Sequence, residues 1–303
     1  MTHKKLVTNG SLFIFFYVIA SAISNVFVNH TTRSISPIVT LFYSSIFTII
    51  FFSILNFGEL SKNISLIKEN KKSILWLNFL NAIIWFIIFY SLKVLSPAVF
   101  SCLFLGAIPI NLFILELKKS KESKKNNLII AILLLAIFIL MLLLVSKDMS
   151  ETNTSQILKY GALVTVLGGV SAAFIMKISK KLADKNLPAS LVVSLRFYGL
   201  LIISLIIIIL NKPQLQLKPI VLLELLALAL VSMALPLYLL QKALKTLNPL
   251  YASIIITVIP ILTYLFQILT GYYSFSNSKF GITILLSISL IVLTYLKRKK
   301  STK

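Results

Sequence analysis

Long apolar stretches recur along the chain, and they constrain its fold more than any other feature. The stretch from Leu128 to Val145 contains no polar side chain, and similar stretches are separated by short polar segments. A helix rises about 1.5 Å per residue, so about 20 residues cross the hydrocarbon core of a membrane. A soluble helical domain would show polar faces at helical spacing. The pattern therefore predicts an all-α integral membrane protein.

Composition supports this class and excludes a nucleic-acid-binding one. The 303 residues are 58% hydrophobic and 13% charged, whereas soluble domains are about a quarter charged. The net charge of +22 arises from lysines spread over many loops and not from one patch. The single cysteine, Cys102, lies in an apolar segment, so an intramolecular disulfide is impossible.

Ten segments are long and apolar enough to cross a membrane as helices. The loops between them are too short for a soluble catalytic or nucleotide-binding domain. The first segment, after Lys4 and Lys5, resembles a cleavable signal peptide, but its apolar run continues to Val28, so we expect an uncleaved helix. The predicted spans are 11–29, 36–56, 73–92, 97–117, 127–146, 158–178, 187–210, 219–241, 248–269 and 280–296.

Loop charges predict the orientation of these helices. If the N-terminus is cytoplasmic, the cytoplasmic segments hold 22 of the 30 Lys and Arg residues, and the outer loops hold seven. Positive charge gathers on the cytoplasmic side of membrane proteins. We therefore predict a multi-pass protein of the cell (inner) membrane with both termini in the cytoplasm.

An internal repeat divides the chain into halves. Leu92–Pro97 (LKVLSP) and Leu244–Pro249 (LKTLNP) are 152 residues apart, and Pro109 and Pro260 follow them. Both copies fall between the third and fourth helices of a five-helix unit. An odd number of helices places the second unit upside down in the membrane. We therefore predict two inverted repeats, 1–146 and 147–303, an architecture typical of alternating-access transporters.

A series of short motifs follows in order along nearly the whole chain: Ser24–Phe27, Ser36–Pro37, Phe89–Lys93, Leu95–Ala98, Leu195–Phe197, Ala243–Lys245 and Asn248–Ser253. In these motifs the chain resembles the ten-helix EamA-type family of the drug/metabolite transporter superfamily. The resemblance implies secondary transport of small metabolites, often amino-acid export, through a cavity lined by the first four helices of each half.

The chain also departs from the family pattern. The family commonly has Arg in the second helix, where this chain has Tyr43–Ser44, and Gly-Glu after the fourth and ninth helices, where it has Glu116–Lys118 and Thr270–Tyr272. These departures leave the substrate open.

Arg196 is the strongest candidate for a substrate-binding residue. It lies about nine residues inside the seventh helix, or roughly 13 Å deep by helix rise. An ionisable group at such depth marks a functional site by default, and a guanidinium pairs well with a carboxylate or phosphate. Snorkelling to the membrane surface, or capping of a broken helix, are the alternatives.

Other polar and aromatic side chains in apolar segments complete the candidate site, since a polar group facing lipid is costly. Glu224, the only acid well within a helix, is a candidate for proton coupling. The further substrate-binding candidates are Asn25, Asn81, Trp85, Tyr198, Tyr238, Ser253, Thr257 and Tyr264.

We expect a secondary transporter of small metabolites, most simply amino acids or related compounds in export or exchange. The alternative is uptake of a salvaged nucleotide-like or adenosyl metabolite. No GxxxxGK[ST] motif binds nucleotide phosphates, and no HxxxxD or DDxxD motif of a membrane enzyme occurs. The expected partners are a small-molecule substrate and the lipid bilayer, with no enzyme activity, ATPase subunit, nucleic acid, metal or cofactor. A monomer and a homodimer both fit.

Overall fold

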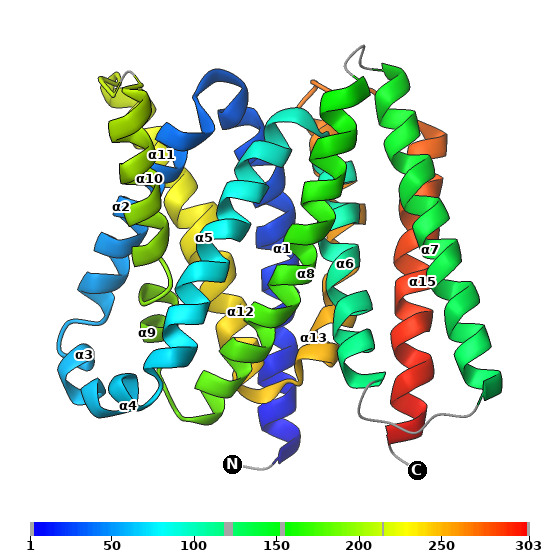
Figure 1. Ribbon diagram of the computed structural model, residues 1–303, viewed down its shortest axis with the longest axis horizontal. Helices are drawn as coiled ribbons and strands as arrows, with labels where there is room; N and C mark the ends of the chain where they lie inside the picture. Colours follow the sequence, from blue (N-terminus) through cyan, green and yellow to red (C-terminus); the bar gives the residue numbers. More distant parts are fainter. Residues whose placement is uncertain (1–2, 118–123, 152–154, 214, 302–303) are drawn as a thin grey trace.

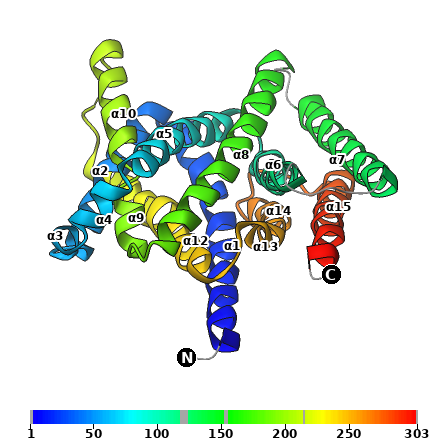
Figure 2. The ribbon, with the colours of Figure 1, turned by 60° about the horizontal axis from the view of Figure 1, so that its bottom comes forward.

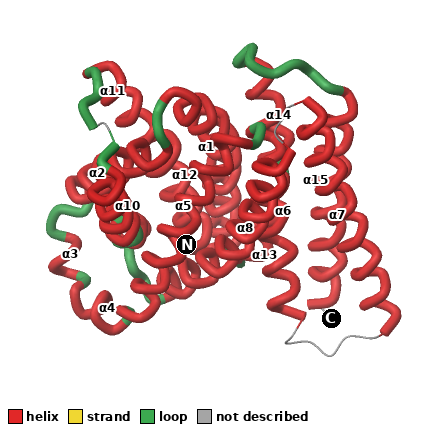
Figure 3. Tube along the Cα trace, turned by 45° about the horizontal axis from the view of Figure 1, so that its top comes forward, coloured by secondary structure: helices red, strands yellow, loops and turns green. Residues whose placement is uncertain are grey.

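The structure is a computed structural model that describes residues 3–117, 124–151, 155–213 and 215–301. Within these ranges the chain forms helices joined by short loops, and no strand occurs (Figures 1 and 3). The helices are α1 (His3–Ser34), α2 (Pro37–Leu55), α3 (Glu59–Lys62), α4 (Ile64–Glu69), α5 (Lys71–Val94), α6 (Pro97–Leu117), α7 (Lys124–Glu151), α8 (Ser155–Asp184), α9 (Ala189–Ser194), α10 (Tyr198–Asn211), α11 (Pro219–Leu228), the π-helix η1 (Ala229–Ala234), α12 (Leu235–Thr246), α13 (Pro249–Ile256), α14 (Ile259–Leu269) and α15 (Asn277–Ser301).

Eight segments among the described residues are long and apolar enough to span a membrane. Helix α7 covers the fifth predicted segment, and α15 covers the tenth with a shorter apolar stretch, Asn277–Leu293. All ten predicted segments are therefore helical, while the number of membrane crossings stays a prediction. The eight segments are Asn9–Ser34, Pro37–Leu55, Lys71–Val94, Pro97–Leu115, Ile157–Asp184, Ala189–Asn211, Pro219–Thr246 and Pro249–Leu269.

The long helices run between two ends of the bundle, which we call the upper and lower ends as drawn in Figure 1. The α5–α6 junction lies at the upper end, and the α12–α13 junction lies at the lower end with both chain termini. A shared end for the termini agrees with an even number of crossings. The side of the membrane that it faces stays a prediction, and lysines 118, 119 and 121, which contribute to that prediction, lie outside the described residues.

The two halves of the chain interlock. Helix α1 packs along α12 and α14, and α8, which begins the second half, packs along α5 and α6. Helix α2 packs against α10, and α7 and α15 lie together at one edge of the bundle (Figure 2). The first helix of each half thus contacts the third and fourth long segments of the other half.

Three of the predicted helical segments are interrupted in the structure. The segment 187–210 breaks at residues 195–197, the segment 219–241 contains η1, and the segment 248–269 breaks at residues 257–258. Proline explains two of these features, because it has no N–H to donate to the carbonyl four residues earlier. Pro260 follows the third break, and Pro236 follows η1.

Candidate functional site

A cavity of about 100 Å³ lies between helices of both halves. The first half contributes α1, α5 and α6, and the second half contributes α8, η1, α12 and the loop between α9 and α10. Its lining residues are Tyr17, Ser21, Ser24, Asn25, Asn81, Ile84, Trp85, Ile88, Phe100, Phe104, Leu105, Ile108, Ala172, Ile175, Met176, Arg196, Ser232, Pro236, Leu237 and Leu240.

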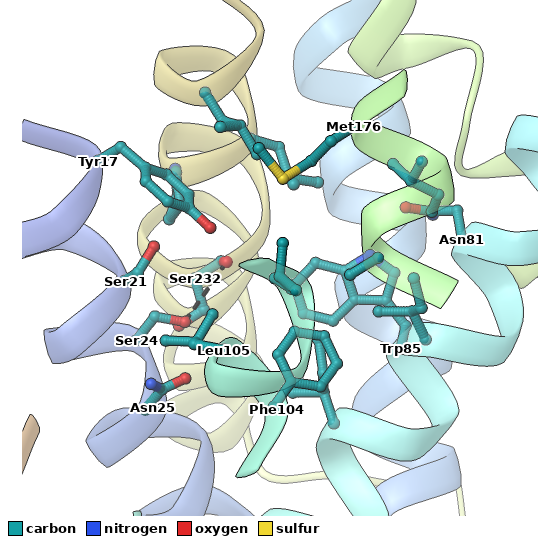
Figure 4. A pocket seen from close by; sticks show the side chains of 18 of the residues that line it. Tyr17, Ser21, Ser24, Asn25, Asn81, Trp85, Phe104, Leu105, Met176 and Ser232 are labelled. Carbon is teal, nitrogen blue, oxygen red and sulfur yellow. Dashed lines mark hydrogen bonds between the residues drawn. The ribbon is translucent and has the colours of Figure 1, made fainter. Parts of the chain in front are cut away.

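Helix α1 presents a polar wall to this cavity. Ser21 follows Tyr17 by four residues, and Ser24 and Asn25 follow Ser21 by three and four residues, so all four side chains share one face of the helix (Figure 4). The Asn25 amide donates a hydrogen bond to Thr263 Oγ1 of α14 at 3.4 Å. This contact fixes one end of the polar wall against the second half.

An aromatic wall lies opposite. Trp85 of α5 packs edge-on against Phe89, with ring centroids 5.8 Å apart, and its ring lies 6.2 Å from that of Phe197. Phe100 and Phe104 of α6 stack at 5.3 Å. In Figure 4, Trp85 and Asn81 lie across the cavity from the α1 residues. The cavity therefore has a polar side formed by α1 and, opposite, an aromatic side that also carries the polar Asn81.

The Asn78 side chain of α5 inserts into the backbone of the interrupted helix α9–α10. Its amide nitrogen donates to the Leu195 carbonyl at 2.6 Å, and its oxygen accepts from the Gly199 N–H at 2.9 Å. In a continuous helix, these two backbone groups would bond to each other. Asn81, one turn along α5, donates to the Arg196 carbonyl at 3.0 Å. Two asparagines of the first half thus hold open a break in the second half.

Arg196 lies within this break and is the largest polar group of the cavity lining. It is 2% exposed, and its Nη2 donates to the neutral hydroxyl of Ser179 at 2.8 Å. Its Nε has no hydrogen-bond partner, and none of the ion pairs among the described residues includes it. A buried charge without a counterion is costly. The arrangement is suited to a ligand that supplies an acceptor and a negative charge.

Ser232 is a second cavity residue with an unused polar atom. It is 2% exposed, its Oγ has no partner, and it lies in the π-helix η1. Pro236 cannot donate to the Ser232 carbonyl, which instead accepts a long hydrogen bond of 3.5 Å from Ser24 Oγ. Short π-helical turns are frequent at functional sites.

Four of the predicted site residues line this cavity: Asn25, Asn81, Trp85 and Arg196. Their role in substrate binding stays a prediction, but the structure brings them together. The remaining candidates lie elsewhere in the molecule.

Tyr198 is 42% exposed on α10, and the Tyr238 ring lies 5.3 Å from Lys242 Nζ. The hydroxyls of Ser253 and Thr257 bond to carbonyls of their own helical segment. None of these four side chains lines the cavity described above.

Tyr264 and Glu224 also lie outside the cavity lining. Tyr264 is bound to Ser276, with its hydroxyl 2.9 Å from the Ser276 carbonyl. Glu224 accepts a hydrogen bond of 2.8 Å from Thr31 Oγ1. Its proposed role in proton coupling stays a prediction.

Sequence reasoning did not single out several lining residues. Tyr17 could have been found, because it lies four residues before Ser21 and eight before Asn25 on one helical face. Phe104 and Met176 could not, because an apolar side chain in an apolar helix carries no signal of the direction in which it points.

A cluster of polar side chains joins the two halves at the upper end. We call Asn29, Arg33, Ser96, Asp148, Tyr273 and Lys279 the upper cluster.

Within the upper cluster, Lys279 Nζ forms a buried ion pair with Asp148 at 2.9 Å, and the Ser96 hydroxyl donates to the same carboxylate at 3.0 Å. Arg33 donates to the Tyr273 hydroxyl at 2.6 Å, and this hydroxyl donates to Asn29 at 3.1 Å. Burial raises the pKa of Tyr273, against the opposing effect of Arg33.

Polar contacts that join the halves at the lower end are exposed. Lys181 Nζ donates to the Ser73 hydroxyl at 3.3 Å, and Lys185 Nζ lies 3.5 Å from a Glu69 carboxylate oxygen, with side chains 50% and 60% exposed. None of the ion pairs described at the lower end is buried like the Asp148–Lys279 pair of the upper cluster.

Comparison with known proteins identifies the second half. Residues 159–295 match the model of the EamA-like transporter family. No curated protein matches the chain. A solved structure described only as "Crystal structure of protein" superposes with a TM-score of 0.67 at 15% identity, over 96% of this chain and 99% of that one. This likeness concerns the fold alone.

The family match and the apolar helices together support a multi-pass membrane protein, and the matched family is one of small-molecule transporters. The predicted resemblance is confirmed for the second half of the chain: residues 159–295 are identified as a match to the EamA-like transporter family, part of the drug/metabolite transporter superfamily.

Proposed function

We propose that the protein is a secondary transporter that moves small metabolites, such as amino acids or related compounds, across the cell (inner) membrane by alternating access. The observation that carries the proposal is the cavity between the two halves, lined by a buried arginine without a carboxylate partner. Asn25, Asn81, Trp85 and Arg196 form the substrate site. Export and exchange both fit this mechanism.

The packing of the helices supports the inverted repeat on which alternating access depends. The α1–α12 contact has its counterpart in the α8–α5 contact, and the α1–α14 contact has its counterpart in the α8–α6 contact. Two halves that pack in equivalent ways can exchange their geometries across a central site. In this proposal ten helices cross the membrane, and both termini are cytoplasmic.

The test is untargeted metabolomics of cells and medium with and without overexpression of the protein. We expect one metabolite class to move in a saturable, gradient-dependent way. Arg196→Ala should reduce this flux at least about tenfold, since it removes a charge-assisted contact. Lys93→Ala, which removes an exposed cation at the end of α5, should leave the flux unchanged. An enzymatic product in purified membranes without any change in flux would overturn the proposal.

A further inference from the structure

We infer that the cavity selects organic anions: the ligand presents a carboxylate to Arg196, a hydrogen-bonding group to Ser232 and an apolar body to Trp85. The inference rests on the proposed function only in identifying this ligand with the transported substrate. The occupancy and charge preference of the cavity can be measured without transport.

The charge of the lining residues favours an anion over a cation. Arg196 is its only cationic residue, and the lining contains no Asp, Glu or His. The guanidinium contacts the neutral Ser179, and its Nε is unpaired. A cation entering this cavity would meet a like charge in surroundings of low dielectric constant, where repulsion is strong. An anion would instead supply the missing counterion.

The unpartnered hydroxyl of Ser232 indicates a hydrogen bond to the ligand. Buried polar groups almost always have a partner, and an orphaned one calls for an explanation. Ser232 Oγ can donate to a ligand oxygen or accept from a ligand N–H. Arg196 and Ser232, which carry these two unpartnered atoms, lie in different segments of the second half and line the same cavity. A ligand in this cavity would satisfy both.

The volume and the apolar surface of the cavity limit the size and shape of the ligand. A cavity of about 100 Å³ is of the same order as an engineered apolar cavity of about 150 Å³ that binds benzene. This favours a small monoanion with at most one ring over a nucleotide-sized compound. Trp85, Phe100 and Phe104 offer aromatic surface to a flat apolar body.

Three probes of matched size test the inference: benzoate, benzamide and benzylamine. The chain has two tryptophans, and Trp76 is 54% exposed, so Trp76→Phe leaves Trp85 in the cavity as the only reporter. Binding is measured by quenching of Trp85 fluorescence in the detergent-solubilised full chain, with excitation at the red edge of the tryptophan band. We expect saturable quenching by benzoate, binding of benzamide that is roughly ten- to a hundredfold weaker, and none by benzylamine.

Substitutions made in the Trp76→Phe protein test the two proposed ligand contacts, with Arg196 and with Ser232. Arg196→Gln should abolish the preference for benzoate over benzamide. Ser232→Ala should weaken benzoate about two- to tenfold, as expected for one hydrogen bond. Ser287→Ala is the matched control, because Ser287 on α15 is also buried with an unpartnered hydroxyl but does not line the cavity. If Arg196→Gln fails to fold, the preference for anions is still tested by the three probes, and the Ser232 contact by the comparison of Ser232→Ala with Ser287→Ala.

Equal binding of all three probes, preference for benzylamine, or binding of none would overturn the inference. An equal effect of Ser232→Ala and Ser287→Ala would overturn the assignment of Ser232. Flux of a cationic metabolite in cells without benzoate binding would overturn this inference and leave the transport proposal standing. Selective benzoate binding without flux of any metabolite would overturn the transport proposal alone.

Discussion

The two halves of the chain build equivalent helices in different ways. In the first half, α2, α5 and α6 are continuous, whereas each of their counterparts in the second half is interrupted. Ser44 of α2 and Arg196 lie 152 residues apart, the spacing of the predicted repeat. The buried serine sits in an unbroken helix, while the buried arginine sits in a break.

This difference shows how the two halves of one fold can divide their tasks. The second half provides irregular backbone and charge at the cavity, and the first half provides the asparagine side chains that bond to this backbone. Asn78 and Asn81 of α5 bond to the backbone at residues 195–199. Irregular backbone inside a membrane protein is tolerated where protein groups satisfy it.

The most severe test of this comparison gives the first half the buried charge that Arg196 provides in the second half. Ser44→Arg places a charge at a fully buried position of α2, and we expect a loss of several kcal/mol or failure to fold. Thermal unfolding of the purified protein and its yield measure this effect. Ser44→Ala should remain folded with near-wild-type stability. If the arginine variant is as stable as wild type, the halves do not differ in the way described.

Removing the bridge across the helix break should have the next largest effect. Asn78→Leu leaves the Leu195 carbonyl and the Gly199 N–H without their partner, which costs about 2–4 kcal/mol in the free energy of unfolding. Asn56→Leu is the control, because the Asn56 amide bonds to Phe52 of its own helix. Equal losses in the two variants, measured by denaturant unfolding, would show that the bridge has no special role.

Restoring a backbone donor should have a moderate effect on binding. Pro236→Ala supplies an N–H that can pair with the Ser232 carbonyl and so regularise η1. We expect benzoate binding, measured by Trp85 fluorescence, to weaken about two- to tenfold. Pro109→Ala in the continuous helix α6 should change the affinity less. If Pro109→Ala weakens benzoate binding more than Pro236→Ala does, the affinity depends on α6 of the first half and not on η1.

The smallest effect concerns a contact that joins the halves in the upper cluster. Burial raises the pKa of Tyr273 above the unfolded value of about 10. The contribution of its neutral hydroxyl is therefore fully present below about pH 10 and is lost as the pH rises through the folded pKa. Thermal unfolding at about pH 9 and about pH 11 should show a smaller loss of stability in Tyr273→Phe than in wild type. Tyr272→Phe, at the exposed neighbour, should behave like wild type.

The sequence predicts the helices well, because the length and apolar character of each segment are local properties. It also singles out Arg196 as a candidate site residue, since a charge deep in an apolar segment is visible without a structure. It cannot predict the break at residues 195–197, which depends on Asn78 from a helix more than a hundred residues away. It also cannot show that Tyr198 and Tyr264 lie outside the cavity lining, because an apolar neighbourhood does not reveal the direction in which a side chain points from the helix axis.

The buried charge of Arg196 makes the proposed transporter sensitive to the membrane potential. Moving one elementary charge through 100 mV changes the free energy by about 2.3 kcal/mol. A bound monoanion neutralises the guanidinium, so the potential acts on the empty protein and hardly on the loaded one. Net flux, which requires the empty protein to return, should depend on voltage, whereas exchange of one anion for another should not.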